Sequence, residues 1–245
     1  MTAERTNDTA ADTPRAEIHH DHRDVTGGWL RPAVFGAMDG MISNVSLIAG
    51  FVGASATPHL VILSGLGGLV AGAFSMGVGE YVSVASQADL ARAEIEVERA
   101  ELLTNAHAER EELAQLYIAR GVEPELAREV ARQLSRDPER ALEIHAREEL
   151  GLTPHDLPSP VLAALSSFLA FSVGALLPLL PFLLGATVFW PAVLVTGIAL
   201  FAAGSAVARI TARPWWYGGL RQLLFGAAAA GVTYGVGAAI GTHVA

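Results

Sequence analysis

Two acidic residues interrupt long apolar stretches in the first third of the chain. Asp39 lies within residues 32–54 and Glu80 within residues 59–84, and Met76 lies one helical turn before Glu80. A carboxylate at bilayer depth costs about 2.5–3.5 kcal/mol on insertion scales, so such residues usually mark ion or proton pathways. Carboxylate oxygens combined with thioether sulfur suit a transition-metal dication of intermediate softness. The pattern favours a cation pathway, and the alternative is a structural role in which each acid bonds a neighbouring helix or an interfacial arginine.

A second set of acids follows in a charged segment after residue 86. Its members advance by four, three, eight and three residues, which keeps them near one helical face: Glu94, Glu98, Glu101, Glu109 and Glu112. Like charges at these spacings repel one another. The row is therefore either a solvated surface or a face that cations occupy.

The composition separates the chain into apolar and charged parts. Hydrophobic residues make up 51% of it, the mean hydropathy is +0.38, and charged residues make up only 17%. Most of that charge lies in the N-terminal tail and in residues 85–157. A net charge of −9 argues against nucleic-acid binding, and the absence of cysteine excludes disulfides and zinc knuckles. No Ser/His dyad, HExxH motif or phosphate loop is present, so we expect no enzyme.

These parts predict an all-α membrane protein with five transmembrane helices and a cytoplasmic helical domain inserted between the second and third. The expected spans are residues 32–54, 59–84, 161–182, 187–208 and 217–241, with Pro178 and Pro181 ending the third. The expected segments are a disordered tail at 1–28, helices 1–2 at 29–86, a metal-binding domain at 87–157 and helices 3–5 at 158–245. In the charged domain, we expect the second span to continue to about residue 103, followed by helices that start near 106, 124 and 138.

The placement of arginine, the only strongly basic residue type in the chain, predicts the topology. With a cytoplasmic N-terminus, five spans bring the tail, the charged domain and the loop 209–221 to one side, and all 16 arginines lie at or inside that boundary. The composition suggests a bacterial plasma membrane. The tail cluster of His19, His20, Asp21 and His22 is either a metal site or a solvated stretch.

Three runs, in this order, resemble the vacuolar iron transporter family. They are Phe-Gly-Ala-Met-Asp-Gly-Met-Ile-Ser-Asn at 35–44, Ser-Met-Gly-Val-Gly-Glu-Tyr-Val-Ser-Val-Ala-Ser-Gln at 75–87, and Glu-Glu-Leu-Gly-Leu at 148–152 before a proline-rich linker. The resemblance covers about residues 30–242. It implies a homodimer with five transmembrane helices per subunit and a cytoplasmic metal-binding domain, which exchanges Fe²⁺ for protons and moves iron out of the cytoplasm.

The resemblance also implies site residues. The family's pore aspartate and methionine fall on Asp39 and Met76, and Glu80 lies in the same run as Met76. Its cytoplasmic glutamates fall on Glu98, Glu101, Glu109, Glu112 and Glu149. The expected partners are divalent metal ions, protons and membrane lipid, and no prosthetic group is expected: Fe²⁺ or another divalent metal is the transported and regulatory ion, with Mn²⁺ as a second candidate.

One position departs from the family pattern. Plant-type members have methionines about a turn before the last glutamate, whereas this chain has His145 and Ala146. His145 lies four residues before Glu149, on the same helical face, and imidazole binds Fe²⁺ but also Zn²⁺, Co²⁺ and Ni²⁺. A membrane-anchored metal sensor or buffer without transport is the alternative function, although an anchor does not need the intramembrane acid Asp39.

Overall fold

The computed structural model describes residues 28–244, and the tail cluster of histidines lies outside this range. The described residues form eight helices and no strands: α1 (Leu30–Gly53), α2 (Pro58–Thr104), α3 (Ala106–Ala119), α4 (Pro124–Leu134), α5 (Pro138–Glu148), α6 (Pro160–Leu183), α7 (Trp190–Ile210) and α8 (Trp215–Val244). Five of them, α1, α2, α6, α7 and α8, are long and apolar enough to cross a membrane. They begin within three residues of the expected starts, so the all-α class and the five spans are confirmed.

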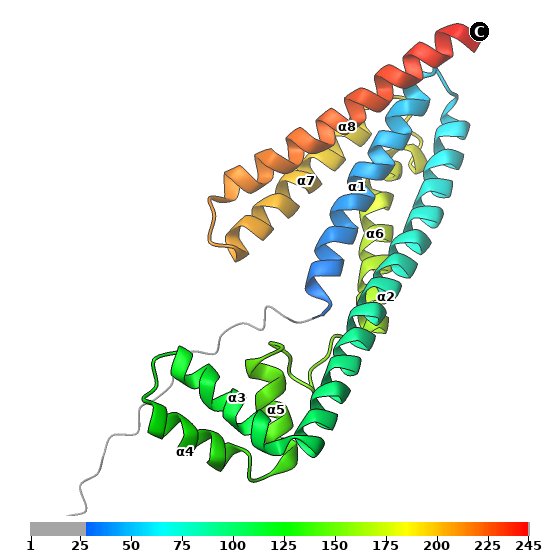
Figure 1. Ribbon diagram of the computed structural model, residues 1–245. Coiled ribbons are helices and arrows are strands. Elements are labelled where there is room, and N and C mark those ends of the chain that lie inside the picture. Colours follow the sequence, from blue (N-terminus) through cyan, green and yellow to red (C-terminus); the bar gives the residue numbers. More distant parts are fainter. Residues whose placement is uncertain (1–27, 245) are drawn as a thin grey trace, which may run out of the picture.

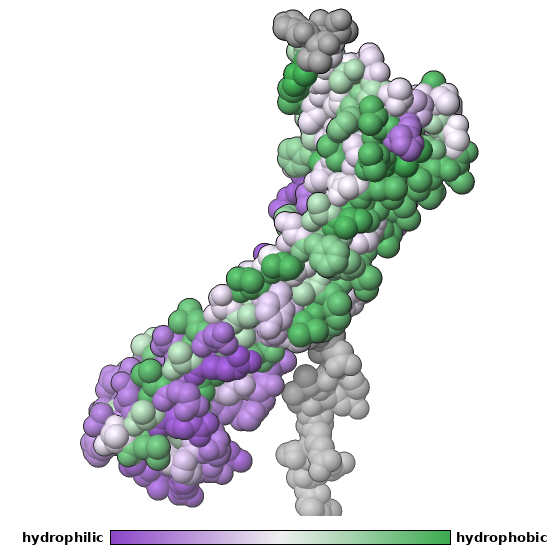
Figure 2. All heavy atoms as spheres, turned by 90° about the vertical axis from the view of Figure 1, so that its right-hand side faces the viewer, coloured by the Kyte–Doolittle hydropathy of each residue, from purple (hydrophilic) through white to green (hydrophobic). Residues whose placement is uncertain are grey.

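The helix α2 joins the apolar bundle to the charged helices (Figure 1). Its 47 residues are about 70 Å long at 1.5 Å per residue, more than twice the thickness of the hydrocarbon core. The helix therefore extends well beyond any membrane that its apolar first half crosses. Helices α3, α4 and α5 pack around the projecting end, and Figure 2 shows hydrophilic residues gathered there below a mostly hydrophobic bundle.

Prolines mark the starts of four helices. Thr57, Glu123, Asp137 and Ser159 each precede a proline, and each side chain accepts a hydrogen bond from a backbone N–H of the first helical turn. Proline suits the first turn because it lacks the N–H that would have no partner there. The predicted starts at Pro124 and Pro138 are confirmed.

The third span ends within one residue of the expected position, but the expectation that Pro178 and Pro181 end it is wrong. Pro178 and Pro181 both lie inside α6, which continues to Leu183. A proline removes one backbone hydrogen bond, and membrane helices tolerate this where neighbouring helices pack around the freed carbonyl. Pro178 is in fact fully buried.

Glycines allow the helices of the bundle to pack closely. A Cβ at Gly40 would lie 2.3 Å from the carbonyl oxygen of Phe171 in α6, and one at Gly218 would lie 2.3 Å from that of Gly204 in α7. In α2, Gly72 faces the ring of Phe171, so this glycine packs against α6 of the same chain. These three glycines thus serve helix packing within one chain.

Candidate metal centre

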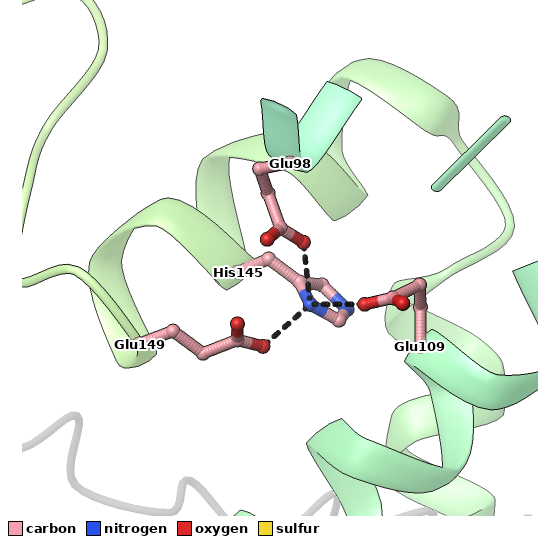
Figure 3. A group of neighbouring side chains, drawn as sticks. All are labelled: Glu98, Glu109, His145 and Glu149. Atoms are coloured by element: carbon pink, nitrogen blue, oxygen red, sulfur yellow. Dashed lines mark hydrogen bonds and ion pairs between the residues drawn. The ribbon is translucent and has the colours of Figure 1, made fainter. Parts of the chain in front are cut away.

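Four side chains from three helices meet where α2 enters the charged domain (Figure 3). Glu98 lies near the end of α2 and Glu109 in the first turn of α3. His145 lies in the last turn of α5, and Glu149 is the residue that follows this helix. Because Asn105 ends α2 and the chain turns into α3 there, the two glutamates face each other from different helices. We call these four residues the Glu98–His145 cluster.

The imidazole of His145 lies at the centre of the cluster. Its Nδ1 atom is 2.8 Å from Oε1 of Glu149, 3.1 Å from Oε1 of Glu98 and 4.0 Å from Oε2 of Glu109. One donor atom from each of the four residues lies within 4.8 Å of all the others. Metal–ligand bonds of about 2.1 Å place donors up to about 4 Å apart, so small side-chain rotations would fit this set around one ion.

The cluster is withdrawn from solvent and has little compensating charge. His145 is fully buried, and Glu98 and Glu109 are 5% and 7% exposed. Among residues 28–244, no arginine lies within 4.0 Å of a carboxylate of these glutamates: Arg99 pairs with Glu96 and Glu139 instead. Oε1 of Glu98 and Nε2 of His145 have no hydrogen-bond partner among the described residues. Buried polar atoms without partners are costly, and a bound cation would satisfy them.

Burial and mutual repulsion alter the acidity of the cluster. Burial, then the negative charge of Glu149, raises the pKa of Glu98 to about 7. Burial and the charges of Glu112 and Glu109 raise the pKa of Glu149 to about 7. The pKa of Glu109 is also raised, first by burial and then by the charges of Glu112 and Glu101. The carboxyl groups of Glu98 and Glu149 therefore exchange protons near neutral pH.

The other members of the predicted acidic row take different positions. Glu101 and Glu112 are exposed and stand outside the four-residue cluster, but their charges reach it, as the pKa of Glu149 and Glu109 shows. Glu94 is exposed and lies a turn before Glu98 on α2. The row predicted along one helical face is thus divided between two helices.

Asp39 and Met76 line one pocket of about 320 Å³ in the membrane-spanning bundle. Asp39 accepts a hydrogen bond of 2.9 Å from the hydroxyl of Ser43. Asn44, also in the lining, donates from its amide to the carbonyl of Ala175 in α6, and its own side-chain oxygen has no partner. The pocket thus gathers a carboxylate, a thioether, a hydroxyl and an amide from α1 and α2.

Phe171 of α6 also lines this pocket, and the sequence did not predict it. No signal in the sequence distinguishes this phenylalanine from the other apolar residues of its span. Ser43 and Asn44 were visible as polar residues near Asp39, although neither belongs to the expected ligand set.

Glu80 does not line that pocket. Its side chain is 14% exposed, and its carboxylate lies 3.8 Å from the guanidinium of Arg31, the second residue of α1. The structure therefore pairs Glu80 with an arginine at the end of the bundle from which α2 leaves for the charged helices (Figure 1).

Comparison with known proteins gives one consistent result. The family model of the VIT family matches residues 30–238. A vacuolar iron transporter of Acanthamoeba castellanii is 42% identical over 219 residues, which is 86% of this chain and 78% of that protein. Vacuolar iron transporter 1 of Oryza sativa subsp. japonica is 32% identical over 239 residues, 95% of each chain. Vacuolar iron transporter 1 of Arabidopsis thaliana is 31% identical over 197 residues, 79% of each chain.

Proposed function

The chain belongs to the VIT family, and we propose that it is a proton-coupled transporter that moves a divalent metal ion out of the cytoplasm. The names of its relatives support iron as the transported metal. Fe²⁺ is the ion we propose first, and Mn²⁺ is the second. The expectation of no catalytic activity agrees with relatives that are named as transporters.

The observation that carries this proposal is the Glu98–His145 cluster. Three carboxylates and an imidazole converge within 4.8 Å, largely buried, and Oε1 of Glu98 and Nε2 of His145 make no hydrogen bond to the described residues. Such a set suits a borderline divalent ion such as Fe²⁺ or Mn²⁺. In our proposal the cluster collects the ion on the cytoplasmic side, and Glu101 and Glu112 attract it by their negative charge.

The helix α2 connects the cluster to the pocket in the bundle. Glu98 and Met76 lie 22 residues apart on this one helix, which is about 33 Å. Glu80 lies between them, and we propose that it passes the ion from the cluster toward Asp39 and Met76. The thioether and carboxylate ligands of that pocket suit a divalent ion of intermediate softness. They bind it less tightly than a site made only of thiolates would, so the ion can leave again.

Proton coupling follows from the carboxylates on this route. A cation that binds Glu98 and Glu149 displaces protons, because both carboxyl groups have a pKa of about 7. Inside the bundle, a cation beside Asp39 lowers the cost of placing its negative charge at bilayer depth. Alternate binding of metal and protons at these carboxylates would give antiport.

The orientation and assembly belong to the same proposal. The arginines at Arg31 and in the loop 209–221 favour a cytoplasmic location of the end of the bundle that carries α3, α4 and α5. We assign 29–86 and 158–245 to the membrane, 87–157 to the cytoplasm and two subunits to the transporter. We propose the bacterial plasma membrane as the location, and this proposal rests on amino-acid composition alone. The relatives named above are eukaryotic proteins that are named as vacuolar.

The test is metal flux in proteoliposomes that contain the purified full-length protein. Wild type should move Fe²⁺ under anaerobic conditions with a proton flux in the opposite direction. Asp39→Ala should abolish both fluxes and still bind metal at the cluster. A wild type that binds Fe²⁺ but moves none would favour the alternative, a membrane-anchored sensor or buffer.

A further inference from the structure

The last third of the chain contains cations without any acid. Residues 157–245 hold Arg209, Arg213 and Arg221 and not one aspartate or glutamate. Arg209 lies at the end of α7, Arg213 in the turn between the two helices, and Arg221 in the second turn of α8. Positive charge is thus concentrated at one end of an otherwise uncharged pair of membrane helices.

The turn between α7 and α8 forms a pocket of about 460 Å³, which we call the arginine pocket. Arg213 lines it from the turn, and Tyr217 and Arg221 line it from one face of α8, four residues apart. The backbone holds Arg213 in place: Ala212 has a left-handed φ of +54°, and the N–H of Arg213 donates to the carbonyl of Ala208 at 2.8 Å.

Thr211 in the lining bonds the carbonyls of Val207 and Ala208, whereas the guanidinium groups of Arg213 and Arg221 have no acidic partner among the described residues. No carboxylate of residues 28–244 lies within 4.0 Å of the guanidinium groups of Arg213 and Arg221. The hydroxyl of Tyr217 makes no hydrogen bond to another described residue. Two guanidinium groups and a phenol around one pocket form a set of donors that suits a phosphate group.

The surroundings indicate where that phosphate comes from. Trp215 and Trp216 begin α8 beside the pocket and are 48% and 54% exposed. Exposed tryptophans at the end of a transmembrane helix typically lie at the depth of the lipid headgroups. Further along α8, Leu220 and Leu224 are exposed and form an apolar surface for acyl chains. The phosphate groups present at high local concentration beside the arginine pocket are therefore those of lipid headgroups.

We propose that the arginine pocket binds the phosphate of an anionic membrane lipid. Basic pockets between transmembrane helices are suited to such headgroups, because their guanidinium groups pair with the charge of the phosphate at the membrane surface. This site is separate from the metal route, since none of its lining residues belongs to the Glu98–His145 cluster or to the pocket of Asp39.

The test is lipid binding by the full-length protein in a neutral detergent, measured by native mass spectrometry. Phosphatidylglycerol, phosphatidylcholine with the same acyl chains, and inorganic phosphate are titrated separately. Wild type should retain phosphatidylglycerol in preference to phosphatidylcholine. The double variant Arg213→Gln/Arg221→Gln should bind phosphatidylglycerol at least about tenfold more weakly. Arg209→Gln is the matched control, because Arg209 lies on the same hairpin but does not line the pocket, and it should bind nearly as wild type.

Four results would overturn the proposal. Equal retention of both lipids by wild type, or an equal loss in Arg209→Gln and the double variant, would show that charge alone or no site at all is responsible. Displacement of the lipid by millimolar inorganic phosphate would assign the pocket to a free anion. A double variant with unchanged lipid binding but altered subunit association would assign it to an acidic surface of a second copy. The lipid-free melting temperatures of all variants confirm that each is folded.

Discussion

Oε1 of Glu98 lies 3.1 Å from Nδ1 of His145, and the two side chains are 6% and 0% exposed. Glu98 belongs to the long helix α2, and His145 to α5, 47 residues further along the chain. This contact holds a titratable carboxyl group in a buried position, where its charged form is costly unless a cation is near. The structure therefore places a destabilising group where a metal ion would compensate for it.

We predict opposite effects of Glu98→Gln on metal binding and on stability. The variant should weaken divalent-metal binding at least tenfold, because a ligand oxygen and its charge are lost. Without metal, it should raise the stability of the α2–α5 contact at pH 8, where Glu98 is charged, and change it little at pH 5. The pKa of Glu98 is raised to about 7, so its contribution to stability is present at low pH and lost as the pH rises through 7.

Thermal unfolding and amide hydrogen exchange in α5, each at both pH values, measure the stability change. Glu94→Gln is the matched control: Glu94 is exposed on the same helix, one turn away, and outside the cluster. A Glu98→Gln protein that is less stable than wild type at pH 8 would contradict the prediction.

Metal binding should release protons, and their number should depend on pH. The pKa of both Glu98 and Glu149 is raised to about 7 by burial and neighbouring carboxylates, and metal binds the deprotonated forms. Metal binding at pH 6 should therefore release about two protons from these two carboxyl groups. Metal binding at pH 8.5 should release almost none from them. Affinity should rise with pH up to about 7.5 and then level off.

Isothermal titration of the full-length protein with Mn²⁺, in buffers of different ionisation enthalpy, counts the released protons. Mn²⁺ avoids the oxidation that complicates Fe²⁺. A proton count that is the same at pH 6 and pH 8.5 would show that the two carboxyl groups are not ligands.

His145→Met should change which metals the cluster prefers. The substitution replaces a borderline nitrogen donor by a thioether, and imidazole contributes strongly to binding of Zn²⁺ and Co²⁺. We expect affinity for these two ions to fall by more than tenfold, and affinity for Fe²⁺ to fall less. Competition titrations under anaerobic conditions measure the ratios. His107→Met serves as control, because His107 is exposed on α3 and outside the cluster. Equal losses for all ions in His145→Met would assign His145 a structural role.

Local rules predicted the helices well, because their signals lie within a few residues of each helix end. Polar residue–proline pairs mark the starts, and Gly121 and Gly151, with left-handed φ of +93° and +66°, follow the ends of α3 and α5. Pro178 was misread because a propensity rule for soluble helices was applied to a buried segment of α6.

The candidate site could be predicted only as a set of residue types. The predicted break between residues 103 and 106 already put Glu98 and Glu109 on different helices, but their spacing did not show that the turn at Asn105 makes them face each other. Their burial depends on how α3 and α5 pack against α2, which no local pattern encodes. The pairing of Glu80 with Arg31 is likewise a tertiary contact.

Glu80 and Arg31 should respond differently to neutralisation if Glu80 passes metal along the route. Glu80→Gln should slow metal flux in proteoliposomes several-fold, because the ion loses an intermediate ligand. Arg31→Gln should leave the flux unchanged or raise it, because Arg31 is a cation that competes for the same carboxylate at 3.8 Å. The pair itself contributes little to stability, about 0–1 kcal/mol, since Arg31 is 85% exposed. Equal slowing in both variants would mean that the pair is structural.

Gly40→Ala should disturb the pocket of Asp39 through the packing of α1 on α6. A Cβ at Gly40 would lie 2.3 Å from the carbonyl oxygen of Phe171, a backbone atom that cannot turn aside, and Phe171 also lines the pocket. Separating the two helices should cost about 1–3 kcal/mol and lower the melting temperature in detergent. Gly67→Ala is the matched control, because nothing lies within 4 Å of its Cβ position on α2. The prediction fails if both variants melt at the same temperature and transport metal equally well, since the close contact between α1 and α6 would then have no role in shaping the pocket.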